Sequence, residues 1–258
     1  MDQARSRAPW SRDDVMVACG LYFTLAFGQM HSRNPRIKEV ARLLGRTPSS
    51  LAMKLTNLAS LDPAHRARGV RGLAGHSRRD EEVWREFQDD WDAMALLSEE
   101  KLQALGDRDT AISEPVRAPS DEATEIEGIR KIRTMQGFFR KVVFAAYDSR
   151  CCITGNPIPD LLIASHILPW SEFPSQRLNP SNGLCLAAHF DRAFDRGLIG
   201  FDGNLRLILG RRLKSHLPNE ALEAEFARRV GQTLHCPDRF APDAGFLAWH
   251  RDRFGLGS

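Results

Sequence analysis

The spacing of apolar residues changes once along the chain, and this change constrains the fold more than any other feature. Up to about residue 148, apolar positions recur at helical spacing. Short period-2 and continuous apolar runs appear only later, in LLIASHILPW, in NGLCLAA and in LRLILG. We therefore predict an α+β protein in which an all-helical N-terminal part precedes a part that mixes short strands with helices.

The N-terminal part contains start and stop signals for several helices. The first helix is predicted from the N-cap residue Ser11 to about Phe27, with acidic residues in its first turn. An apolar stripe from Ile37 to Leu44 predicts a second, short helix that ends at Gly45. Thr47-Pro48 then suits the N-cap and N1 positions of a third helix.

Two longer helices are predicted further along the chain, at residues 81–102 and 126–148. The helix at 81–102 is acidic and amphipathic. Its core-facing side is expected to consist of Val83, Phe87, Trp91 and Met94.

The second and third helices, joined by a turn around a glycine, are typical of a helix-turn-helix. Such a motif places the second of its two helices in the major groove of DNA. Five polar or basic residues on or beside that helix are therefore expected to contact DNA: Arg46, Ser49, Ser50, Lys54 and Asn57. The alternative is an ordinary helical hairpin that packs without binding DNA.

Charge is segregated along the 258 residues, although the net charge is only +3. Residues 1–80 carry a net charge of +8, residues 81–127 carry −11, and residues 128–258 carry +6. Two basic blocks separated by an acidic one indicate two modules that face a polyanion, unless the charges only solvate the surface. We expect a helical DNA-binding domain at 1–104, an acidic linker at 105–125 and a second domain at 126–258.

Several classes of protein are excluded by composition. No apolar run approaches the roughly 18 residues of a membrane span, and the first ten residues lack the apolar core of a secretory signal. Five cysteines, of which Cys151 and Cys152 are adjacent, do not form a disulfide framework. We expect a cytoplasmic protein in which Cys151, Cys152 and Cys185 belong to the core.

Four residues in the second domain carry the chemistry that we expect. His166 closes a strand-like run, Asn182 lies in a turn, and His189 and Asp191 begin a predicted helix. Taken singly, each has a structural explanation. Together they match phosphodiester hydrolysis, which needs a base to deprotonate water and a divalent cation to neutralise the phosphate.

The stretch CCITGNPIPDLLIASHILPW, followed by RLNPSNGLCLAAHFDRAFDRGLIGFD, resembles an HNH endonuclease of the ββα-metal type. The resemblance covers about residues 136–254 and is greatest to the restriction-like subgroup. It implies that His166 activates the attacking water and that Asn182 anchors a loop. It also implies that Asp191 binds a metal ion and that His189 is a ligand or a helper. The metal implied is Mg²⁺ or Mn²⁺, with Ni²⁺ and Zn²⁺ as alternatives.

The sequence departs from the family pattern at two points. Many relatives carry a metal-binding Asp or His just before the general base, whereas this chain has Ser165. Many relatives also carry paired cysteines that bind a structural zinc ion. Cys151, Cys152 and Cys185 of this chain cannot form such a four-cysteine site. Three arginines are expected to clamp phosphates or to form surface ion pairs: Arg150, Arg192 and Arg196.

The function expected from these features is that of a metal-dependent endonuclease on double-stranded DNA, acting in restriction or defence against foreign or modified DNA. Each active site of this type cuts one strand, so double-strand cleavage would require a homodimer or two successive nicks. The alternative is a non-catalytic DNA-binding regulator whose HNH domain has degenerated. An RNA-directed nuclease is less favoured, because no aromatic platform for single strands is apparent.

Overall fold

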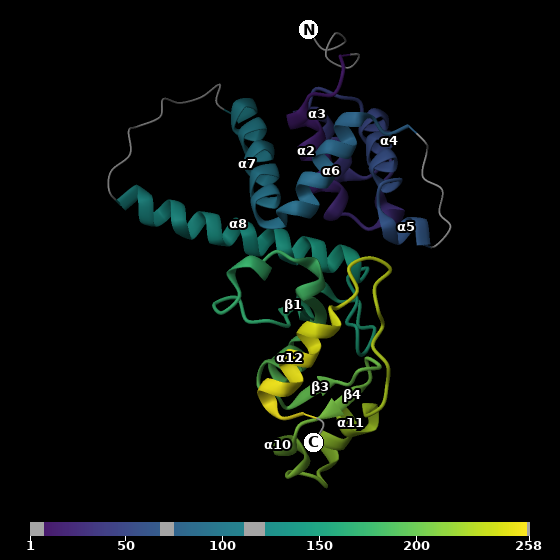
Figure 1. The fold of residues 1–258 in the computed structure, drawn as a ribbon, viewed down its shortest axis with the longest axis vertical. Coiled ribbons are helices and arrows are strands. Elements are labelled where there is room, and N and C mark those ends of the chain that lie inside the picture. Colours follow the sequence, from purple (N-terminus) through teal and green to yellow (C-terminus); the bar gives the residue numbers. More distant parts are fainter. Residues whose placement is uncertain (1–7, 68–74, 111–121, 257–258) are drawn as a thin grey trace. The chain divides into compact units, whose positions relative to one another are not determined.

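The computed structural model describes residues 8–67, 75–110 and 122–256, without the side chains of 66–67, 108–110 and 122–129. The chain divides into two compact units, Met1–Val142 and Val143–Ser258. The first is helical and the second contains all the strands among the described residues (Figure 1). This arrangement confirms the predicted α+β class, with a mostly helical N-terminal region and small antiparallel hairpins with a helix after it.

The N-terminal unit consists of α2 to α7 and the first part of α8. The elements in chain order are α2 (Arg12–Phe23), η1 (Phe27–Gln29), α3 (Pro35–Leu43), α4 (Pro48–Ala59), α5 (Pro63–Ala67), α6 (Arg78–Asp89), α7 (Trp91–Thr110) and α8 (Glu122–Ala146). Helix α2 is the centre of this unit, since α4, α6 and α7 all pack against it. Its residues from Val15 to Phe23 are buried.

The predicted helix starts at Ser11 and Thr47 and the predicted helix end at Gly45 are confirmed, whereas the first helix ends at Phe23 and not near Phe27 as predicted. The Ser11 hydroxyl accepts a hydrogen bond from the Asp14 amide, and the Asp14 carboxylate accepts one from the Ser11 amide, which completes a capping box. Gly45 takes a left-handed φ of 63° after α3. The Thr47 hydroxyl accepts a hydrogen bond from the Ser50 amide at the start of α4.

The single helix predicted at residues 81–102 is wrong, because the structure has two helices that break at Asp90. The backbone of Asp90 leaves the helical region, with φ −145° and ψ 84°. Its carboxylate then accepts a hydrogen bond from the Ala93 amide at the start of α7. An aspartate competes for backbone donors in this way and favours a cap over a helix interior.

The acidic linker expected at 105–125 is only partly described. Helix α7 continues through Thr110 and α8 begins at Glu122, so both edges of that segment are helical. Residues 111–121 lie outside the described part of the chain. The division between the compact units falls later, inside α8, between Val142 and Val143.

The second unit is built around a ββα arrangement. Strand β1 (Leu162–His166) pairs antiparallel with β2 (Gly183–Ala187), so that His166 is opposite Gly183. Helix α9 (Ala188–Asp195) follows β2 directly and packs against both strands. A second hairpin, β3 (Ile199–Phe201) and β4 (Leu207–Leu209), comes next.

Short helices surround these two hairpins. They are η3 (Pro159–Leu161), η4 (Pro174–Gln176), η5 (Pro180–Asn182), α10 (Arg211–Lys214), α11 (Glu220–Glu225), η6 (Ala227–Arg229) and α12 (Ala244–Phe254). Helix α12 is anchored to α9 by His250, whose ring stacks on Phe194 with centroids 3.7 Å apart. The His250 Nε2 donates a hydrogen bond to the Phe194 carbonyl oxygen at 3.0 Å. Because Phe194 is buried in α9, this contact fixes the position of α12 against α9.

None of the helices in the described part of the chain is both long and apolar enough to cross a membrane.

Candidate nuclease site

His166 is held at the end of β1 by a main-chain oxygen. Its Nε2 donates a hydrogen bond to the Arg177 carbonyl oxygen at 2.9 Å. A carbonyl only accepts, so the Nε2 carries the hydrogen, and the neutral ring keeps its lone pair on Nδ1. Burial lowers the pKa of His166, although the hydrogen bond to Arg177 opposes the shift. The side chain therefore favours the neutral form that a general base requires.

Asn182 holds the loop that supplies this oxygen. Its side-chain Oδ1 accepts from the Leu168 amide at 2.7 Å, and its Nδ2 donates to the Gln176 carbonyl at 3.0 Å. The Asn182 main-chain oxygen also accepts from the Ile167 amide at 2.9 Å. Gln176 precedes Arg177, so Asn182 positions the residue next to the partner of His166. The resemblance implied a loop anchor at Asn182, and the contacts suit that role.

His166 and Asp191 line the same pocket, which we call the His166 pocket. It has a volume of about 580 Å³ and lies between β1, α9, α12 and the loop after β1. Its charged lining residues are Glu172, Asp191, Arg192, Asp195, Arg196 and Arg253. Trp170 covers the ring of His166 in an edge-to-face contact, with centroids 5.4 Å apart. A strand imidazole and a helix carboxylate thus face one cavity.

Asp195 is a lining residue of the His166 pocket that the sequence reasoning missed. It follows Asp191 by four residues on α9, which puts both carboxylates on one face of the helix. Burial and then the charge of Asp191 raise the pKa of Asp195, while Arg192 and Arg196 lower it. The i, i+4 spacing in DRAFD was the signal that could have found this residue.

Residues 151–202 match the family model described as HNH endonuclease. This segment, residues 151–202, is an HNH endonuclease domain. The matched segment holds β1, β2 and α9, and with them His166, Asn182 and Asp191. It is narrower than the range of about 136–254 over which the sequence resembles the family. No curated protein matches the chain.

His189 contacts Glu225 and Phe226, so the structure does not bring it together with His166 and Asp191 as the expected ligand or helper. Its Nε2 lies 3.3 Å from the Glu225 carboxylate, and its ring contacts Phe190 and Phe226. It does not line the His166 pocket. Residues two apart on an α-helix point about 200° apart, so His189 and Asp191 cannot face one ion.

Two of the three arginines expected near the HNH site line its pocket. Arg192 and Arg196 are exposed and belong to the pocket wall. Arg150 does not, since its guanidinium donates to the Gly155 carbonyl at 3.4 Å outside the pocket. Arg150 therefore cannot contact a phosphate bound in this pocket.

The residues around the His166 pocket fit a hard divalent cation that keeps several water ligands. Asp191 and Asp195 offer carboxylate oxygens, which Mg²⁺ and Mn²⁺ prefer. The Ser165 Oγ, also at the pocket, is buried without a hydrogen-bond partner in the described structure. Among the described residues, no group of three or more His, Cys, Asp or Glu side chains could hold a metal ion. Water or phosphate oxygens would therefore complete the coordination.

Two of the predicted DNA contacts in the N-terminal unit are buried. Lys54 Nζ lies 2.8 Å from the Asp80 carboxylate, and both side chains are at most 8% exposed. Arg46 pairs with Asp14 at 3.0 Å. Lys54 follows Leu51 by three residues, so it belongs to the buried face of α4. Both residues hold the unit together, and neither is free to bind phosphate.

The other predicted contacts in this unit are accessible to different degrees. Ser49 is exposed, while Ser50 and Asn57 are half-buried. Asn57 donates a hydrogen bond to the Gly75 carbonyl at 3.1 Å. Groove recognition by α4 therefore depends on fewer side chains than expected, and it stays a prediction.

Proposed function

We propose that this protein is a metal-dependent endonuclease that hydrolyses phosphodiester bonds in double-stranded DNA. One observation carries the proposal: the His166 ring donates through Nε2 to the Arg177 carbonyl, in the same pocket as Asp191. This arrangement leaves Nδ1 as the basic nitrogen of the neutral ring. The HNH match supports the class of reaction.

His166 would act as the general base. Its Nδ1 would take a proton from the attacking water, and the positive charge that develops would be shared through Nε2–H with the Arg177 oxygen. A lowered pKa keeps the ring unprotonated at neutral pH. The His166 ring also packs against Trp170, and its hydrogen bond to Arg177 orients it for this transfer.

Asp191 would bind the divalent cation, with Asp195 one turn away as a second carboxylate. When bound, the cation would neutralise charge on the phosphate and on the leaving oxygen. Arg192 and Arg196 would add positive charge at the rim of the pocket. Affinity for DNA should then fall steeply as the salt concentration rises.

The biological setting that we propose is restriction or defence against foreign or modified DNA. Its support is the likeness of the SHI, SNGL and FDRG elements to the restriction-like subgroup. The N-terminal unit would bind DNA and direct the nuclease domain to its target.

A matrix of divalent metals and DNA substrates tests this function. Purified protein is incubated with plain, methylated, hydroxymethylated and glucosylated plasmids in Mg²⁺, Mn²⁺, Ni²⁺ or Zn²⁺. We expect cleavage in Mg²⁺ or Mn²⁺ and loss of cleavage, with DNA binding kept, in His166→Ala. Equal cleavage rates on all four plasmids would exclude the proposed role in defence against modified DNA.

The same experiment separates the nuclease from its alternative, a non-catalytic DNA-binding regulator. The presence of Ser165 in place of a stronger ligand is the feature that favours the regulator. Binding to DNA without cleavage in any metal would support it and would overturn the nuclease proposal.

A further inference from the structure

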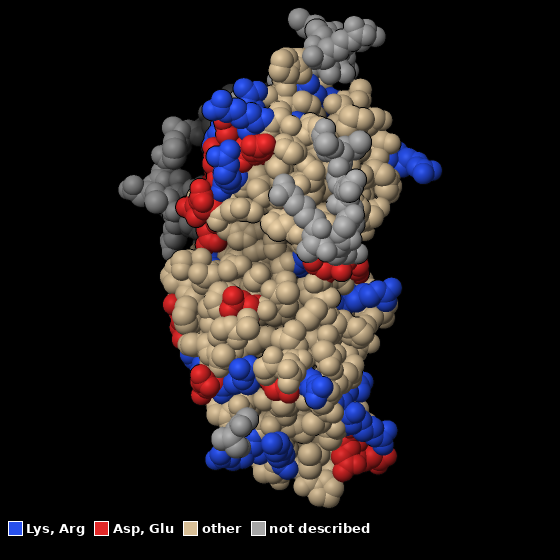
Figure 2. Space-filling model, turned by 45° about the vertical axis from the view of Figure 1, so that its right-hand side comes forward, with Lys and Arg blue, Asp and Glu red and all other residues tan. Residues whose placement is uncertain are grey.

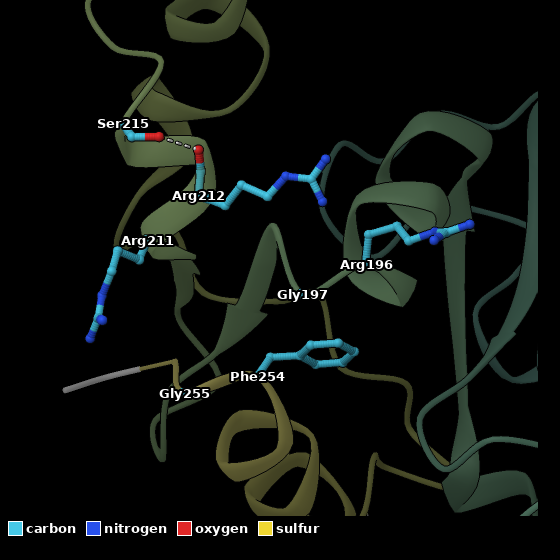
Figure 3. Close-up of a pocket in the computed structure, with 7 residues that line it drawn as sticks. All are labelled: Arg196, Gly197, Arg211, Arg212, Ser215, Phe254 and Gly255. Carbon is cyan, nitrogen blue, oxygen red and sulfur yellow. Dashed lines mark hydrogen bonds between the residues drawn. The ribbon is translucent and has the colours of Figure 1, made fainter.

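A second pocket, which we call the arginine pocket, lies beside the His166 pocket in the C-terminal unit. It has a volume of about 540 Å³ and is lined by residues from three elements (Figure 3). Arg196 and Gly197 follow α9, Arg211 and Arg212 belong to α10, and Phe254 and Gly255 end α12. Only Arg196 and Gly197 lie within the segment that matches the HNH family.

Two glycines allow the elements that form the walls of the arginine pocket to pack closely. Gly197 has a left-handed φ of 62°, and a Cβ added to it would overlap the Phe254 ring. A Cβ added to Gly210, just before α10, would overlap the Gly197 carbonyl oxygen. The Gly210 amide also donates to the Leu198 carbonyl at 2.8 Å. The position of α10 beside the end of α9 is therefore fixed by close backbone packing.

Two arginines of the arginine pocket have no acidic partner among the described residues. Arg211 and Arg212 are exposed, and neither forms an ion pair with a carboxylate of the described residues. Arg196 interacts with Asp195, whose pKa it lowers. On the face drawn in Figure 2, basic side chains lie at the end of the unit that carries α10 and α11, with acidic ones among them. Three arginines around one hollow favour an anionic ligand.

The arginine pocket continues into the His166 pocket, because Arg196 and Phe254 line both. In the view of Figure 3, Arg212 extends across the space above the Phe254 ring toward the helix end that bears Arg196. Arg211 points to the other side of α10, and the Arg196 side chain leads away from Arg212. The three guanidinium groups thus do not converge on one point.

From this arrangement we propose that Arg211 and Arg212 bind backbone phosphates of DNA next to the scissile phosphate, with Arg196 between the two pockets. The inference rests on the nuclease function and extends it to a track for the substrate strand. Separated guanidinium groups match a polyanion whose charges are spaced along a chain. A single small anion would instead need donors that converge.

Salt-dependent DNA binding tests the track without requiring cleavage. In a His166→Ala background, Arg211→Gln/Arg212→Gln is compared with Arg206→Gln/Arg228→Gln. The second pair removes the same charge from exposed arginines that line neither pocket. Binding to a fluorescent duplex is measured by anisotropy between about 50 and about 200 mM salt, and thermal midpoints verify folding.

We expect the Arg211/Arg212 variant to bind more weakly, with a salt slope smaller by about 1.8 than that of the parent. Between these two salt concentrations, the affinity of the variant for DNA should therefore fall by a factor about tenfold smaller than the affinity of the parent does. With His166 restored, the same double substitution should raise KM for DNA and leave kcat nearly unchanged.

Two results would overturn the track, and both differ from failure of the nuclease function. Equal slopes and affinities for the two double variants would exclude Arg211 and Arg212 as phosphate contacts. The arginine pocket would instead be assigned to a small anion if the Arg211/Arg212 variant bound the duplex as the parent does and the parent bound inorganic phosphate tightly. Absence of cleavage in every metal would instead overturn the nuclease function and leave the binding comparison valid.

Discussion

The Nε2 of His166 donates a hydrogen bond to the main-chain oxygen of Arg177 at 2.9 Å. This contact decides which nitrogen of the ring is basic, and Asn182 holds the preceding residue, Gln176, from the other side. A main-chain acceptor cannot take up the proton, unlike a carboxylate. The ring is therefore oriented without being made more basic by a negative charge, and burial lowers its pKa.

The acid limb of the pH–rate profile should lie below the usual histidine range. Because the base works unprotonated and burial lowers its pKa, kcat/KM should fall with a midpoint under about 6.5 as the pH decreases. Steady-state cleavage of plasmid over a pH series measures this midpoint. His189→Ala, which alters a histidine outside the His166 pocket, should leave it unchanged. A midpoint above the usual value would contradict the environment that we describe.

Asn182→Ala should lower both stability and turnover. The substitution leaves the Leu168 amide and the Gln176 carbonyl without their partner inside the domain. We expect the free energy of unfolding to fall by about 3 kcal/mol. Urea denaturation measures this loss, and single-turnover cleavage below the transition measures the misplacement of His166. Asn204→Ala, in the exposed turn between β3 and β4, is the control; a similar effect there would refute a specific role for Asn182.

Asp191→Asn should change how the rate of DNA cleavage depends on the concentration of divalent metal. Loss of the carboxylate at the His166 pocket should raise the Mn²⁺ concentration at half-maximal rate by at least about tenfold. Asp195→Asn should act in the same direction and more weakly. Glu172→Gln is a matched control in the same pocket, because Glu172 pairs with Arg253 at 2.6 Å. An unchanged metal titration in Asp191→Asn would exclude this residue as a ligand.

The C-terminal unit should lose stability in mild acid through His250. Burial lowers the pKa of His250 to about 4, whereas the unfolded chain has the ordinary value of about 6.5. As the pH falls, the unfolded state takes up the proton first. The contribution of His250 to the free energy of unfolding is therefore fully present above about pH 6.5. It is lost as the pH falls toward about 4, by about 3 kcal/mol in total.

Urea denaturation at a series of pH values, with wild type and His250→Phe, measures this contribution. The phenyl ring keeps the stack on Phe194 but cannot titrate, so the difference between the two proteins should shrink as the pH falls. His216→Phe, at an exposed histidine, should behave as wild type does. A constant difference between wild type and His250→Phe would show that His250 does not titrate as described.

The parts of the fold that sequence predicts well are those with local causes. The caps at Ser11 and Thr47 and the glycine at position 45 determine helix ends through neighbouring backbone groups. The short strands and the helix after them were indicated by the apolar runs, and the ββα arrangement was implied by the resemblance to HNH endonucleases. The break at Asp90 was missed because its cause, a side-chain cap, competes with an apolar spacing that continues across it.

The site was predicted less completely, because it depends on the directions in which side chains point and on partners that lie far apart in the sequence. His189 and Asp191 are neighbours in sequence, but the helix turns them to different sides. Lys54 and Arg46 find carboxylates at positions 80 and 14, and no local pattern reveals those pairings. The oxygen of Arg177 is a main-chain atom, so the identity of residue 177 gives no sign of its contact with His166.

The single-turnover cleavage rate of His166→Ala, measured with saturating DNA and Mn²⁺, tests the central role of this imidazole most directly. General-base catalysis predicts a rate at least about a hundredfold below wild type, with DNA affinity unchanged and with His189→Ala close to wild type. A His166→Ala protein that cuts within a few-fold of the wild-type rate would contradict the account.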